Sequence, residues 1–147
     1  MKKKSFSVTI DAAPAKVWEQ LWGKESYPAW TAPFSAGSSV ETDNWKKGSK
    51  VKFLDANNHG MVSYVSENIP NEYMSFQHVG NIKDGVEDLD SPEVKEWAGS
   101  KENYTLKTVN GKTELTVDLD LPDEHVDVFN TTFPAALEEL KKLSEGN

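Results

Sequence analysis

The 147-residue chain carries 24 acidic and 16 basic residues, which gives a formal net charge of −8 at pH 7, and 10% of its residues are aromatic. Such an acidic chain is a poor partner for nucleic acid or an anionic membrane surface, and the lack of cysteine excludes disulfides, thiol nucleophiles and cysteine-ligated zinc. The length fits one domain with a substantial core, so residues 1–147 are assigned to a single domain.

The chain begins with a predicted strand and two short helical segments. Apolar and polar residues alternate over residues 5–10, the pattern of a strand with one apolar face. Pro14 suits a first helical position, and the helical spacing of apolar residues predicts a helix from there to Trp22. Residues 24–37 mix aromatic residues with proline and glycine, which indicates one further helical turn and a loop that carries Trp30 and Phe34 inward.

The middle of the chain predicts an antiparallel meander. Strand-like alternation recurs, with turn-forming residues between the segments, over residues 38–44, 48–55, 61–66 and 72–79. Residues 80–90 are acidic and polar and are predicted to form a loop. Ser91 is a suitable N-cap, and Pro92 a suitable first residue, for a short helix that ends near Gly99.

A two-residue hairpin turn is predicted at Asn110-Gly111, which lies between two alternating segments. In such a turn the numbers of paired residues sum to 221, so Leu106 opposes Leu115 and Lys107 opposes Glu114. One face of the hairpin is then apolar and the other polar and charge-paired. A slip of one residue would move the apolar face into water, so the register is strongly specified.

Residues 122–144 predict a long amphipathic helix. Apolar residues recur at steps of three and four, at Val126, Phe129, Phe133, Leu137, Leu140 and Leu143. Because this stripe must be buried, we expect the helix to lie across the inner face of a curved antiparallel sheet. Pro134 removes a backbone hydrogen bond within the helix, so we expect the fold to gain from a bend there.

Short motifs along nearly the whole chain match a known superfamily. They are Ala13–Trp18, Trp30, Trp45 with Gly48, Gly60–Val62, Pro70 with Met74–Phe76, Asn103–Leu106, Gly111–Thr116, and Phe133–Leu137 with Leu140–Lys141. The chain resembles the helix-grip (START-like, SRPBCC) superfamily, which includes START-type lipid-transfer domains, polyketide cyclases and plant pathogenesis-related proteins. It is most similar to the family named for the C-terminal domain of the activator of heat-shock-protein-ninety ATPase homologue.

The resemblance implies an α+β helix-grip fold. In that fold a curved antiparallel sheet of about six or seven strands wraps a long C-terminal helix, and two short helices follow the first strand. Members share this shape and differ in what they bind: many bind small molecules, some are enzymes, and some act on chaperones. Fold alone therefore does not identify the function.

A set of aromatic and amphipathic side chains is predicted to point between helix and sheet: Trp30, Phe53, Met74, Phe76, His78, Tyr104, Phe129 and Phe133. Such residues can simply fill a core. His78 and Tyr104 favour a ligand site instead, because each carries a polar end that needs a partner when buried. An apolar pocket with a few convergent polar groups is typical of a small-molecule site.

The sequence contains no recognisable catalytic or metal motif. The three histidines, His59, His78 and His125, lack metal-ligand spacing, and residues 55–60 resemble the start of a calcium loop whose twelfth position is Ser66 instead of glutamate. No nucleophile elbow or glycine-rich phosphate loop is present. We therefore predict no catalytic residue, no metal and no cofactor.

Three functions follow from these patterns. The first is a non-enzymatic protein that binds a small hydrophobic or aromatic ligand in the cavity. The second is an enzyme of the cyclase, hydrolase or lyase kind, with His78 and Tyr104 as acid-base groups. The third is a regulator that binds a chaperone through its outer surface. The basic start has no apolar run behind it, and no segment is long enough to span a bilayer, so we expect a cytoplasmic protein.

Overall fold

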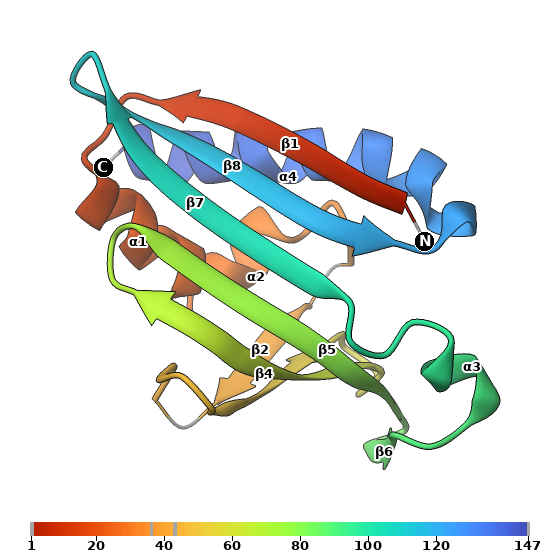
Figure 1. Ribbon diagram of the computed structural model, residues 1–147. Coiled ribbons are helices and arrows are strands. Elements are labelled where there is room, and N and C mark those ends of the chain that lie inside the picture. Colours follow the sequence, from red (N-terminus) through yellow and green to blue (C-terminus); the bar gives the residue numbers. More distant parts are fainter. Residues whose placement is uncertain (1, 36, 43, 147) are drawn as a thin grey trace.

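The computed structural model describes residues 2–35, 37–42 and 44–146, which form an antiparallel sheet and a long C-terminal helix (Figure 1). The strands are β1 (Lys2–Ile10), β2 (Ser39–Thr42), β3 (Lys50–Leu54), β4 (Gly60–Ile69), β5 (Tyr73–Lys83), β6 (Val86–Asp88), β7 (Lys101–Val109) and β8 (Lys112–Leu121). The helices are α1 (Pro14–Trp22), α2 (Ser26–Trp30), α3 (Pro92–Lys95), the 3₁₀ turn η1 (Asp123–His125) and α4 (Val126–Glu145). The predicted α+β helix-grip fold is confirmed.

The strands pair in the order β1-β8-β7-β5-β4-β3-β2, with β6 added beside β5. Every pair is antiparallel. The first strand, β1, pairs with the last strand, β8, so these two strands are neighbours in the sheet. In Figure 1, α4 runs behind β1 and β8, and α1 and α2 lie on the same side of the sheet. The helices and the curved sheet therefore enclose one interior.

The segment 80–90 differs from the predicted loop. Strand β5 continues to Lys83, and β6 folds back on it so that Lys83 pairs with Val86. Between them, Asp84 and Gly85 take φ values of 50° and 80°. Asp-Gly favours a two-residue hairpin turn as Asn-Gly does. The acidic and polar composition of residues 80–90 is also typical of an exposed loop, so composition alone did not indicate the turn.

The hairpin at Asn110-Gly111 is confirmed with its register. Both residues have positive φ, 53° and 80°, and Leu106 pairs with Leu115 and Lys107 with Glu114. The inner face of this hairpin carries buried residues of β7 and β8. The turn therefore fixes the pairing register of β7 and β8, whose buried residues face the interior.

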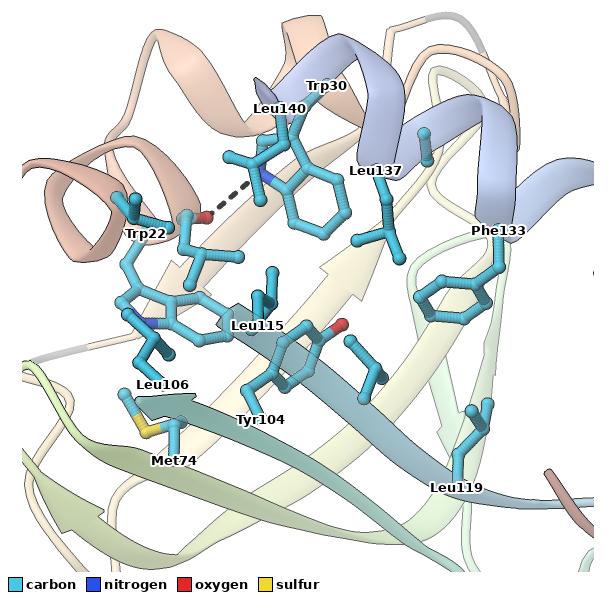
Figure 2. Close-up of a cluster of buried hydrophobic side chains, with 14 of the residues drawn as sticks. Trp22, Trp30, Met74, Tyr104, Leu106, Leu115, Leu119, Phe133, Leu137 and Leu140 are labelled. Atoms are coloured by element: carbon cyan, nitrogen blue, oxygen red, sulfur yellow. Dashed lines mark hydrogen bonds between the residues drawn. The ribbon is translucent and has the colours of Figure 1, made fainter. Parts of the chain in front are cut away.

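Helix α4 supplies one wall of the core. Phe133, Ala136, Leu137 and Leu140 are buried along it, whereas the predicted stripe residues Val126, Phe129 and Leu143 are only partly buried. Figure 2 shows Leu137 and Leu140 pointing toward the sheet, and the indole nitrogen of Trp30 donating to the carbonyl of Leu21 at 3.1 Å. These contacts hold α1, α2 and α4 together against the sheet.

Pro134 lies on the exposed face of α4. Proline has no backbone N–H, so the carbonyl one turn earlier lacks its helical hydrogen-bond donor. That carbonyl lies on the side of the helix that water reaches. No helix in the part of the chain that the structure describes is both long and apolar enough to cross a membrane.

Candidate functional site

A chain of hydrogen-bonded polar side chains crosses the inner face of the sheet. Ser63 Oγ on β4 lies 2.5 Å from His78 Nδ1 on β5, and His78 Nε2 lies 3.1 Å from Glu102 Oε1 on β7. The hydroxyl of Tyr104 donates to the other oxygen of Glu102. One arrangement of protons satisfies every partner: Ser63 donates to Nδ1, and a neutral His78 donates from Nε2 to the carboxylate.

The hydrogen-bonded chain forms because side chains alternate between the two faces of each strand. Residues 102 and 104 are two apart on β7, so their side chains point to the same face, and β5 places His78 next to them across the strand pair. Ser63 pairs with His78 across β4 and β5, where a β-bulge shifts the register. Three strands thus contribute to one hydrogen-bonded chain, in which His78 and Tyr104 bond the carboxylate of Glu102 and Ser63 bonds His78.

The carboxylate of Glu102 stays ionised in this surrounding. Burial alone would raise its pKa, but the hydrogen bond from His78, the electrostatic attraction of the His78 ring and the hydrogen bond from Tyr104 outweigh the burial and lower the pKa below its usual value. Burial, and then the negative charge of Glu102, raise the pKa of Tyr104 well above its usual value. The same two causes raise the pKa of Tyr27. The interior therefore holds one anion among neutral aromatic hydroxyls.

An open pocket of about 310 Å³ lies above this polar chain, between the sheet, α2 and α4. Its walls are aromatic: Tyr27, Trp30, Phe34, Phe53, Phe129 and Phe133. His78, Glu102 and Tyr104 line its sheet side. We call this space the aromatic pocket. Glu102 keeps 21% of its side-chain surface exposed, although hydrogen bonds hold both of its oxygens.

A second pocket, of about 490 Å³, adjoins the first and shares Met61, His78, Glu102 and Phe129 with it. Its outer wall includes Glu93, Glu96, Asp120, Glu124 and His125. We call this space the acidic pocket. Glu102 and Phe129 line both spaces, so they lie between the aromatic pocket and the acidic pocket.

The predicted site residues divide into two groups. Trp30, Phe53, His78, Tyr104, Phe129 and Phe133 all line the aromatic pocket. Phe76 is fully buried beneath it, edge-on to Trp22, Phe53 and Tyr104, and Met74 lies further along β5 beside α1. The structure therefore places Met74 and Phe76 in the core behind the pocket.

Sequence reasoning did not identify Glu102, Ser63 or Tyr27. For Glu102 a signal was present: the register that sums to 221 pairs it with Leu119, on the apolar face of the hairpin. A carboxylate on an apolar face must find partners, which marks it as a site candidate. Tyr27 lies in the irregular segment after α1, where no periodicity fixed the direction of its side chain.

Burial and pKa limit what the groups of the polar chain can do to a bound molecule. Ser63 is fully buried and lines neither pocket, so it cannot attack a bound molecule. A carboxylate with a lowered pKa is a weak base, and a tyrosine with a strongly raised pKa is a weak acid. Among the residues that the structure describes, no group of three or more His, Cys, Asp or Glu could hold a metal ion.

A larger hollow, of about 600 Å³, lies near β2, β3 and α1. Trp22 and Trp45 form its apolar part, and Lys24, Lys50 and Lys52 line it. Both Lys50 and Lys52 pair with Glu87 at the surface. None of its described lining residues belongs to the polar chain, so we take the aromatic pocket as the candidate site despite its smaller volume.

The model of the family described as "Activator of Hsp90 ATPase homolog 1-like protein" matches residues 11–145. A solution structure of the Aha1 dimer from Colwellia psychrerythraea is similar, with 23% identity, a TM-score of 0.72, and coverage of 99% of this chain and 97% of that one. DynU16 of the dynemicin biosynthetic locus has 16% identity and a TM-score of 0.72, over 100% of this chain and 49% of that one.

CalU16 from Micromonospora echinospora is similar at 12% identity with a TM-score of 0.67, over 97% of this chain and 75% of that one. At such identities the likeness to solved structures shows the fold alone. No curated protein matches the chain in sequence.

Proposed function

The chain belongs to the family of activator of Hsp90 ATPase homolog 1-like proteins, and on that premise we propose that it binds a small apolar or aromatic ligand in the aromatic pocket without converting it. The fold is consistent with a ligand-binding domain, and its interior lies between α4 and the sheet. The observation that carries the proposal is a pocket of about 310 Å³ whose walls are aromatic and whose sheet side is a satisfied polar chain.

The walls support this proposal physically. Protein interiors are close-packed, with few voids larger than a water molecule, so six aromatic side chains around one open space need an explanation. Phe34, Phe53 and Phe129 are each only partly buried there. Apolar surface that remains hydrated is unfavourable, and an apolar ligand would release that water.

The family description supports a second candidate, a regulator that binds a chaperone of the Hsp90 type through its outer surface. The two candidates are separable. A chaperone regulator changes the ATPase rate of the purified chaperone, whereas a ligand-binding protein that acts alone leaves that rate unchanged. Measuring the rate with and without the protein tests the second candidate independently of the pocket.

A neutral aromatic probe tests the first candidate. N-phenyl-1-naphthylamine fluoresces strongly when it leaves water, and we expect saturable binding to the wild-type protein. Phe133→Trp would place a larger ring in the aromatic pocket and should weaken binding at least about tenfold. The matched control is Val128→Trp, because Val128 is 57% exposed on the same helix.

The control variant should bind the probe as the wild type does. Failure of the wild type to bind any neutral aromatic probe below its solubility limit would overturn the proposed function. Equal weakening by Phe133→Trp and Val128→Trp would move the binding site away from the aromatic pocket.

A further inference from the structure

The charges that line the two pockets are all of one sign apart from histidine. Asp55 and Glu102 line the aromatic pocket, and Glu93, Glu96, Asp120 and Glu124 line the acidic pocket next to it. Among the lining residues that the structure describes, none is a lysine, and the sequence contains no arginine. Lys3 pairs with Asp120 at 3.1 Å but does not line the acidic pocket, so an anionic ligand would meet no lysine or arginine in the described lining of either space.

Glu102 keeps a full negative charge between the two pockets. Its partners, His78 and Tyr104, donate hydrogen bonds but carry no charge in the proton arrangement that satisfies Ser63. Two donors leave part of the acceptor capacity of the carboxylate unused. Glu102 lines both pockets and is only partly covered, so its carboxylate lies beside the space that a ligand would occupy.

The aromatic walls form two groups of rings around that charge. Tyr27 lies edge-on to Trp30 at 5.6 Å between centroids and is 6.2 Å from Phe53. Phe34, Phe129 and Phe133 lie within 4.9 to 5.8 Å of one another. The faces of aromatic rings attract cations, and rings that surround a space next to a carboxylate are typical of sites for alkylammonium groups.

From this geometry we infer that the ligand is an organic cation, an apolar or aromatic molecule whose ammonium group lies among the rings beside Glu102. The inference rests on the proposed function, because it names the chemical class that the aromatic pocket accepts. Carboxylates and sulfonates of the same shape are excluded by repulsion from Glu102 and by the absence of a lysine or arginine partner among the described lining residues.

Three probes that share a phenylpropyl group test the inference by calorimetry at physiological ionic strength. They are phenylpropyl-trimethylammonium, its neutral isostere with a tert-butyl group, and phenylbutanoate as the anion. The wild-type protein should bind the cation at least about tenfold more tightly than the neutral isostere, and the anion more weakly than either. This ranking needs no variant, so it holds even if a substitution impairs folding.

Glu102→Gln removes the charge and keeps the size of the side chain. The polar chain can reorganise around it: the glutamine amide would donate to His78 Nε2, its oxygen would accept from Tyr104, and His78 Nδ1 would donate to Ser63. The cation-to-neutral affinity ratio should fall to about one in this variant. Glu138→Gln, on the exposed face of α4, removes one charge elsewhere and should leave the ratio as in the wild type.

The outcomes separate the inference from the proposed function. Equal binding of the cation and its neutral isostere by the wild type, or tighter binding of the anion, overturns the inference and leaves the proposed function standing. Binding of none of the three overturns the proposed function and the inference with it. A preference for the cation that persists in Glu102→Gln overturns the role of Glu102.

Discussion

Phe133→Ala measures how closely the wall of the aromatic pocket is packed, because the cost of the substitution depends on what surrounds the ring. Phe133 is 3% exposed, stacks on Phe6 at 5.0 Å, and meets Phe34 at 4.9 Å between centroids. Its remaining surface lines the pocket. In a solid core the change costs ~3 to 5 kcal/mol, through lost contacts and a new void. Because neighbouring side chains cover almost all of the Phe133 ring, we expect a cost within that range.

Leu140→Ala provides the internal comparison. Leu140 is fully buried on the same helix and lines neither pocket, so its loss should cost ~3 to 4 kcal/mol, within the range for buried leucine. Urea unfolding followed by tryptophan fluorescence gives both free energies of unfolding. The expected order is that Phe133→Ala costs at least as much as Leu140→Ala, because it deletes more carbon atoms from a covered position. A clearly smaller cost for Phe133→Ala would refute close packing of this ring at the pocket wall.

Two further predictions concern the hairpin and the buried carboxylate. Gly111→Val should lower the free energy of unfolding by ~1 to 3 kcal/mol, because φ is +80° there and a β-branched residue resists that conformation. Gly111→Asn should cost less. Equal melting temperatures for the two variants would contradict the turn strain. Because the pKa of Glu102 is lower in the folded protein than its usual value of 4.5, the folded state binds fewer protons, and this stabilisation is complete above pH 4.5 and lost as the pH falls through the folded pKa. The stability advantage of wild type over Glu102→Gln should therefore shrink on acidification below pH 4.5 in urea titrations, and parallel curves would show that the pKa is unshifted.

Local patterns were sufficient for the elements and for much of the fold. The Asn110-Gly111 turn and the alternation beside it determined the β7–β8 register, because turn chemistry and face polarity are both short-range properties. The apolar stripe of the last helix determined that it must be covered. The predicted loop at 80–90 was wrong because the Asp84-Gly85 turn lies in an acidic stretch whose composition also suits an exposed loop. The helix predicted to end near Gly99 ends at Lys95.

The candidate site depended on tertiary structure. His78 and Glu102 are 24 residues apart, and they meet because β7 pairs with β5 while β6 and α3 project from the path of the sheet. No local pattern specifies which strands become neighbours, since that choice is made by the burial of the whole apolar face. The pocket itself arises where side chains from α2, β3 and α4 leave space unfilled, and such space depends on the packing of every wall at once. The sequence alone therefore determined which faces are apolar, whereas tertiary packing decided that one carboxylate would stand among aromatic rings.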